Sequence, residues 1–221
     1  MMRLITFLAA TAFIVFLGAV IFTIAGTVNL PTIWLYLAIY VGFSAACALV
    51  MSEGVARERL QPGPGSRPEP VYRIGATVAW IAHIGIAALD LGRFHWSAGF
   101  PVWLHAVGVV GMVWAMGLVL WALRHNEYLS ARIRIQSDRG HQVVMTGPYA
   151  HIRHPNNAGA FLLGLSSGLV LGSWPSIVPA LVFVALVAYR TLNEERVLFA
   201  ELEGYKEYAS QVRYRFLPGV W

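Results

Sequence analysis

The sequence has few charged residues for its length. Only 12% of its 221 residues are charged, whereas 57% are hydrophobic. A chain with so little polar surface cannot cover a soluble globule, but a lipid bilayer accepts the excess of apolar side chains. The composition therefore predicts an integral membrane protein that forms one domain over residues 1–221.

Cysteine and several cofactor motifs are also scarce or missing. The single thiol, Cys47, excludes an internal disulfide. No cysteine joins the scattered histidines, so we predict no metal site. Neither a Gly-x-Gly-x-x-Gly motif nor a P-loop occurs, which argues against a Rossmann-type cofactor site.

The net charge of +5 comes from arginines in short loops beside apolar runs. This pattern is typical of contact with anionic lipid headgroups, and we predict no nucleic-acid partner.

Long apolar runs are present, and they predict an all-α protein with about six transmembrane helices. The first four runs approach or exceed the ~20 residues that cross a bilayer as a helix. The last two are shorter and joined by Gly172-Ser173, which predicts a short helical hairpin. The six runs are residues 4–25, 32–51, 74–91, 101–123, 158–171 and 174–189.

The loops between these runs differ sharply in charge. With six crossings, fifteen of the sixteen basic residues fall on one side of the membrane, and only Arg93 falls on the other. Basic loops stay in the cytoplasm, so we expect both termini and the loop 124–157 there. Two ionisable residues within the third apolar run, His83 and Asp90, would be costly at mid-membrane, although Asp90 lies near the end of the run and can reach water.

The loop 124–157 concentrates polar side chains at the entrance of the next helix. Residues 132–136 alternate polar and apolar, and a turn at 137–140 predicts a short hairpin that returns through 141–145. Pro155 suits the first turn of the following helix. Arg153 and His154 therefore precede a helix N-terminus, where free N–H groups favour an anion. Headgroup anchoring is an equally simple interpretation of this pair.

The C-terminal region has a second polar feature. Arg190 and Glu194 are four residues apart and share a helix face, although such a pair is often only a surface ion pair. Farther on, an apolar stripe predicts an interfacial helix. Its residues are Leu198, Leu202, Tyr205, Ala209 and Val212.

These segments resemble the isoprenylcysteine carboxyl methyltransferase (ICMT) family, as a bacterial-type member. The resemblance covers about the last ninety residues and rests on 141–159, Glu194-Glu195, Gly204-Tyr205, Tyr208 and 215–218. It implies a methyltransferase of the bacterial inner membrane that uses S-adenosylmethionine. Within the single domain, residues 1–123 would form the N-terminal spans, and 124–221 the catalytic loop, the hairpin and the tail.

The resemblance also implies site residues. It places Arg153, Arg190 and Glu194 in catalysis, and Arg190 and Arg153 against the substrate. The cofactor-binding residues that it implies are Gln136, His141, Gln142, Val143, Val144, Tyr149, His154, Pro155, Asn156, Asn157 and Glu194. The family commonly has Tyr at the position of Asn157.

The acceptor is expected to be a small lipophilic molecule or a lipid, and the resemblance favours a carboxylate that is methylated on oxygen, as in an isoprenylcysteine. A carboxylate would need no base, and Arg153 or Arg190 could hold one of its oxygens. An amine or thiol must lose a proton, which would make Glu194, Glu195 or His154 a candidate base. Phospholipid amine or thiol methylation, an NADPH-dependent membrane reductase, and a non-enzymatic lipid-binding or transport protein are the alternatives.

Overall fold

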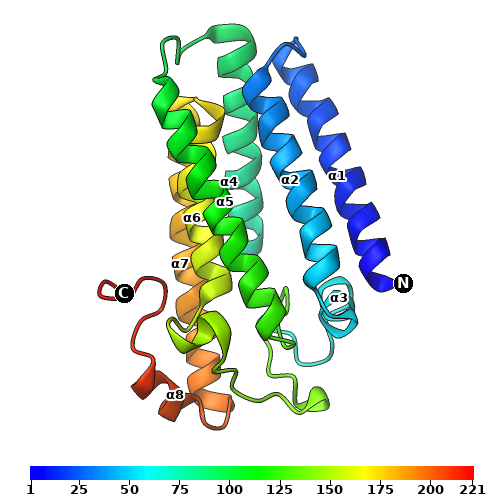
Figure 1. Cartoon of the computed structure of the whole chain (residues 1–221), viewed down its shortest axis with the longest axis vertical. Helices are drawn as coiled ribbons and strands as arrows, with labels where there is room; N and C mark the ends of the chain where they lie inside the picture. The colour runs from blue at the N-terminus through cyan, green and yellow to red at the C-terminus, as the bar shows by residue number, and fades with distance from the viewer.

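The computed structural model describes residues 1–221, and every regular element in it is helical. Six helices run along the long axis, and the shorter α3 and α8 lie at the lower end (Figure 1). The elements are α1 (Met2–Ala25), α2 (Pro31–Val50), α3 (Glu53–Leu60), α4 (Pro70–Leu89), a π turn (Asp90–Phe94), α5 (Val102–His125), two 3-10 turns (Ser137–Arg139 and Gly147–Ala150), α6 (Pro155–Leu171), α7 (Trp174–Glu201) and α8 (Tyr205–Gln211).

Five helices are long and apolar enough to cross a membrane, namely α1, α2, α4 with its π turn, α5 and α7. This finding agrees with the predicted all-α membrane protein. The sixth predicted span, α6, has only 17 residues. The last predicted span, residues 174–189, continues past its apolar part, since α7 is one helix of 28 residues that ends at Glu201. Helical geometry therefore carries Arg190 and Glu194 beyond the apolar part of the same helix.

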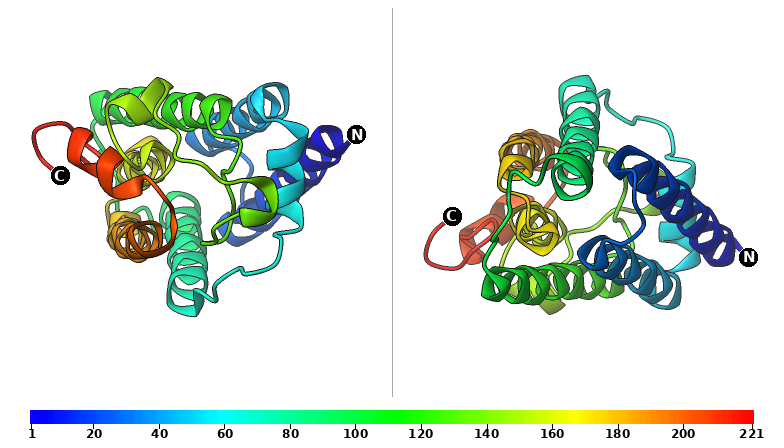
Figure 2. Two further views of the ribbon diagram at one scale, coloured as in Figure 1. Left: turned by 90° about the horizontal axis from the view of Figure 1, so that it is seen from below. Right: turned by 90° about the horizontal axis from the view of Figure 1, so that it is seen from above.

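The helices form a ring of paired elements. Seen along the long axis, α1 and α2 lie on one side, α6 and α7 on the other, and α4 and α5 between them (Figure 2). The segment between α5 and α6 crosses the lower end, and both termini lie in the lower half of the molecule (Figure 1). The N-terminal ammonium contacts Glu53 at the start of α3. The two termini and the polar loop therefore lie toward the same end of the helix bundle.

Glycine permits the close packing of α5 against α6. A Cβ at Gly159 would lie 2.5 Å from Val119 Cγ2 and 2.8 Å from the Ala115 carbonyl oxygen. On the other helix, a Cβ at Gly108 would lie 2.6 Å from the backbone nitrogen of Val170. Small residues let helix backbones approach in this way inside a membrane protein. The packing positions the start of α6, where the polar loop joins the bundle.

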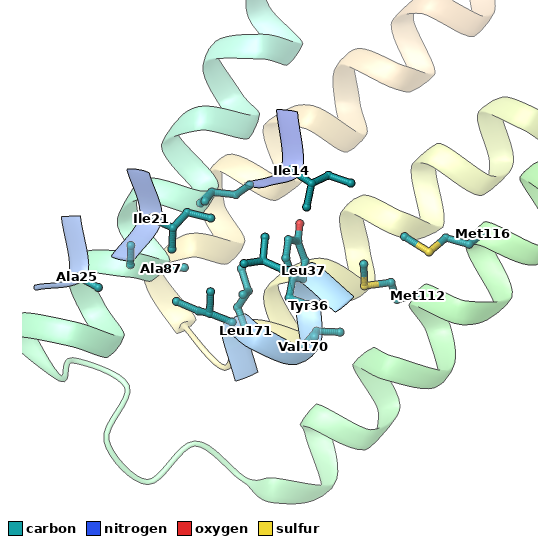
Figure 3. Close-up of a cluster of buried hydrophobic side chains, with 13 residues drawn as sticks. Ile14, Ile21, Ala25, Tyr36, Leu37, Ala87, Met112, Met116, Val170 and Leu171 are labelled. Carbon is teal, nitrogen blue, oxygen red and sulfur yellow. The ribbon is translucent and has the colours of Figure 1, made fainter. Parts of the chain in front are cut away.

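The largest apolar cluster lies away from that loop. It includes Ile21, Tyr36, Leu37 and Met112 and draws on helices α1, α2, α4, α5 and α6 (Figure 3). Tyr36 turns its hydroxyl to Ser167 at 2.8 Å, and Ser167 in turn contacts His83 Nε2 at 2.8 Å. The costly mid-membrane histidine is therefore fully hydrogen-bonded, since its other ring nitrogen contacts the Ser176 carbonyl.

Two local predictions were wrong. Residues 132–145 contain no strand and no hairpin ladder, and only a 3-10 turn at Ser137–Arg139 is regular. The stripe from Leu198 to Val212 is not one interfacial helix, because α7 ends at Glu201 and Gly204 adopts a φ of 79° before α8. The break folds α8 back, so its apolar residues pack on the loop around Ile135 and Val143.

Candidate active site

A cleft lies where the α5–α6 loop, the start of α6, the end of α7 and α8 meet. We call it the loop cleft; it encloses about 810 Å³, openings included. Every predicted site residue except Gln136 and Pro155 lines it. Those that do are His141, Gln142, Val143, Val144, Tyr149, Arg153, His154, Asn156, Asn157, Arg190 and Glu194. Segments more than fifty residues apart in the sequence are thus brought to one space.

Gln136 and Pro155 support the cleft from behind its wall. Gln136 is fully buried; its amide donates to the Tyr128 carbonyl, and its carbonyl accepts from Arg139. These contacts hold the loop in shape. Pro155 is buried in the first turn of α6, as its position in the sequence predicted.

His141 presents a neutral ring to the cleft. Its ring stacks on Tyr128 with centroids 4.4 Å apart, and its Nδ1 accepts the N–H of Gln136 at 3.2 Å. Burial, together with the positive charges of Arg134 and Arg139, lowers the pKa of His141 to about 4. The imidazole is therefore uncharged at neutral pH, and the tautomer that fits this bond leaves the proton on Nε2.

Arg190, Glu194 and Asn157 form a connected group on one side of the cleft. Arg190 Nη1 donates to Glu194 Oε2 at 3.1 Å and to Asn157 Oδ1 at 3.2 Å. Asn157 Nδ2 donates to Glu194 Oε2 at 2.7 Å and to the Thr191 hydroxyl. The Arg190 side chain is only 8% exposed, and Nε faces Glu69 at 3.3 Å. This is not the surface ion pair that the spacing alone would suggest.

One donor group and one acceptor atom of this group make no hydrogen bond within the protein. They are Nη2 of Arg190 and Oε1 of Glu194, whereas Nη1 of Arg190 and Oε2 of Glu194 are both engaged. Glu194 is 27% exposed and lines the cleft. The group therefore offers one free cationic N–H face and one free carboxylate oxygen to a ligand.

Arg153 has different surroundings from Arg190. Its guanidinium donates to Glu195 Oε1 at 2.7 Å and to the carbonyls of Val212 and Arg213 at 2.9 and 2.7 Å. Glu195 Oε2 accepts from Arg215 at 2.6 Å. The arginine thus ties α7 to the C-terminal tail, which favours a positioning role over contact with a substrate.

The start of α6 does not present all of the free N–H groups expected there. The N–H of Arg153 donates to the Tyr214 carbonyl at 2.9 Å, and that of His154 to the Arg215 carbonyl at 3.1 Å. The tail therefore occupies donors that the sequence had assigned to an anion. The His154 ring lies 3.6 Å from Glu195 and 3.4 Å from the Tyr205 hydroxyl.

Two tyrosines of α8 complete the wall. The sequence analysis had placed Tyr205 on the apolar stripe of an interfacial helix and both tyrosines among the residues that carry the resemblance, but neither among the site residues. Tyr205 and Tyr208 are buried and line the cleft, and the Tyr208 hydroxyl donates to the Tyr149 carbonyl at 2.7 Å. Burial raises the pKa of both phenols, so each stays protonated. The sequence could have identified both tyrosines as cleft residues, because both belong to the segments that carry the family resemblance.

A second, larger cavity lies inside the helix bundle. This bundle cavity encloses about 1790 Å³, openings included, and 22 of its 30 lining residues are hydrophobic. Its wall follows α2 from Tyr36 to Ala48, which at about 1.5 Å per residue is about 18 Å. Four residues line both cavities: Ser130, Asn156, Asn157 and Arg190.

This arrangement agrees with the comparisons to known proteins. The model of the isoprenylcysteine carboxyl methyltransferase (ICMT) family matches residues 106–200. Over this segment the chain is similar to the ICMT family. The match confirms the resemblance seen in the sequence and supports a membrane methyltransferase. It covers α5, the loop, α6 and nearly all of α7, which carry the shared wall of the two cavities.

The solved structures support the fold of the whole chain. The chain is similar to the eukaryotic intramembrane Ras methyltransferase ICMT, with a TM-score of 0.55 and 22% identity over 95% of this chain and 75% of that chain. The similarity includes the N-terminal helices, for which the sequence had offered only compatible hydropathy. No curated protein matches the chain.

Proposed function

We propose that the protein transfers a methyl group from S-adenosylmethionine in the loop cleft to a lipophilic acceptor in the bundle cavity. The observation that carries this proposal is the wall shared by the polar cleft and the apolar cavity at Arg190 and Asn157. A cytoplasmic cofactor and a membrane-borne acceptor would meet only there. The proposed orientation places this end of a bacterial inner-membrane protein in the cytoplasm, because the basic loops gather at it.

The loop cleft fits the proposed cofactor. S-adenosylmethionine supplies an electrophilic methyl group and carries an ammonium group and a flat base. The free Oε1 of Glu194 can accept from a cationic N–H, and the stacked rings of Tyr128 and His141 provide an aromatic face. A neutral His141 avoids repulsion of the positive cofactor. Tyr149 and His154 would form the opposite wall.

The residues of the shared wall suit a carboxylate acceptor. Arg190 can direct its free Nη2 at the acceptor's carboxylate while Glu69, Glu194 and Asn157 hold the rest of the guanidinium in place. The apolar wall of the bundle cavity excludes water around the acceptor, so alignment and desolvation contribute most of the rate enhancement. A carboxylate nucleophile needs no base. For an amine or a thiol, the free Oε1 of Glu194 offers a candidate base beside Arg190.

The test uses purified protein in detergent with radiolabelled S-adenosylmethionine. We expect S-adenosylmethionine to bind, S-adenosylhomocysteine to compete, and label to pass to a prenylated cysteine carboxylate. Arg190→Ala should lower turnover at least a hundredfold, about 2.7 kcal/mol, since it removes the donor to the acceptor. Its S-adenosylmethionine affinity should change much less, whereas Tyr149→Ala and His154→Ala should weaken that affinity. Binding of NADPH without any response to S-adenosylmethionine would overturn the proposal.

A further inference from the structure

An aromatic ring of α4 lies against the guanidinium of Arg190. The ring belongs to Tyr72, in the first turn of α4 and outside residues 106–200, which the family model matches. The guanidinium carbon of Arg190 lies 5.2 Å from the ring centroid, within the ~6 Å over which a cation and an aromatic ring attract each other. Both residues line the bundle cavity. The contact therefore joins the start of α4 to the shared wall of the two cavities.

The packing of α4 against α7 makes this contact possible. The two helices run in opposite directions (Figure 1). A Cβ at Gly75 of α4 would lie 3.0 Å from Leu186 Cδ1 of α7, so the missing side chain lets the helices approach closely. Tyr72 precedes Gly75 by about one helical turn, and Arg190 follows Leu186 by about one turn. Because the helices are antiparallel, the ring and the guanidinium reach the same level of the bundle.

The polar contacts of Arg190 do not fix the plane of its guanidinium by themselves. All of its hydrogen bonds leave from Nη1, toward Glu194 and Asn157. Nε lies 3.3 Å from Glu69 Oε1, but that oxygen makes no hydrogen bond, so the pair attracts without imposing a direction. The Tyr72 ring adds an attraction to the face of the group, which opposes tilting of the plane. Nη2 then remains as the edge that a ligand can reach.

We propose that Tyr72 is a positioning residue, which holds the guanidinium plane of Arg190 so that Nη2 points to the junction of the loop cleft and the bundle cavity. This inference rests on the proposed function and adds a residue of α4 to the site. A small misplacement of a group that aligns the reacting molecules lowers the rate of the chemical step. The Tyr72 hydroxyl makes no hydrogen bond within the protein, so the ring alone carries this role. Because Tyr72 acts through Arg190, its effect requires the guanidinium.

The test measures methyl transfer from radiolabelled S-adenosylmethionine to N-acetyl-S-farnesylcysteine by the purified protein. Tyr72→Leu should lower kcat about tenfold, because an aliphatic side chain does not attract the guanidinium. Its affinity for S-adenosylmethionine should stay within about twofold of the wild type, since Tyr72 does not line the loop cleft. Tyr72→Phe keeps the ring and should retain kcat within about twofold. In an Arg190→Gln background, Tyr72→Leu should change kcat by less than about twofold, because the interaction is already lost.

Tyr40→Leu is the matched control, because Tyr40 also lines the bundle cavity but its ring contacts Tyr36 instead of Arg190. Its effect on kcat should be the same in the wild-type and the Arg190→Gln backgrounds. An equal loss from Tyr72→Leu in both backgrounds, or the same loss in Tyr72→Phe, overturns the proposal. If Tyr72→Leu does not fold, Tyr72→Met decides, and an unreduced kcat in that variant refutes the positioning role. Failure of the proposed function is separate, since it would appear as no S-adenosylmethionine binding in the wild type.

Discussion

Removal of the Arg153 guanidinium should destabilise the tail before it affects any acceptor. Arg153 and Glu195 are 6% and 5% exposed, and the arginine also satisfies two tail carbonyls. Loss of one partner of a buried ion pair costs about 3–5 kcal/mol. Because Arg215 still contacts Glu195 at 2.6 Å, we expect Arg153→Met to lie at the lower end, about 3 kcal/mol. For a chain of this size that is a fall in Tm of about 6–12 °C.

The assay is thermal unfolding in one detergent, combined with limited proteolysis of the C-terminal tail. Arg213→Met is the control, because Arg213 neighbours the same contacts and forms no ion pair itself. The double variant Arg153→Met with Glu195→Leu should recover part of the loss, since no unpaired charge is left buried. If Arg153→Met melts like the control and only raises KM for the acceptor, the positioning role is wrong. Arg153 would then contact the substrate, as the family resemblance implied.

Two further predictions concern pH and topology. The pKa of His141 is lowered to about 4 from an ordinary 6.5, so its stabilising effect is complete above pH 6.5 and is lost as the pH falls toward 4. After allowance for its partial exposure, the wild type should lose about 1 kcal/mol more stability than His141→Gln between pH 7 and pH 5 in thermal unfolding; parallel pH profiles would contradict the assignment. Reporter domains inserted after Asp138 and near Ser97 should report the cytoplasm and the opposite side, respectively, because the basic residues segregate between these loops. A cytoplasmic signal from both insertions would exclude the proposed orientation.

The sequence alone determined the features that depend on neighbours along the chain. Apolar runs long enough to cross a bilayer predicted the membrane helices, because the bilayer imposes a minimum length on any spanning helix. Pro155 marked the start of α6 because proline suits the first helical turn. The spacing of Arg190 and Glu194 predicted their contact because residues four apart share a helix face. The family motif added the cleft residues of the loop.

Only the tertiary structure decided which of these groups are free to act. Arg153 and Arg190 look alike in the sequence, yet contacts with the distant tail occupy Arg153, whereas Arg190 keeps one donor free. The buried ion pair between Glu58 and Arg134 had no motif to mark it, because the two residues are 76 positions apart in the sequence. Such long-range contacts arise from the packing of whole helices, and local patterns of hydropathy and charge do not encode them.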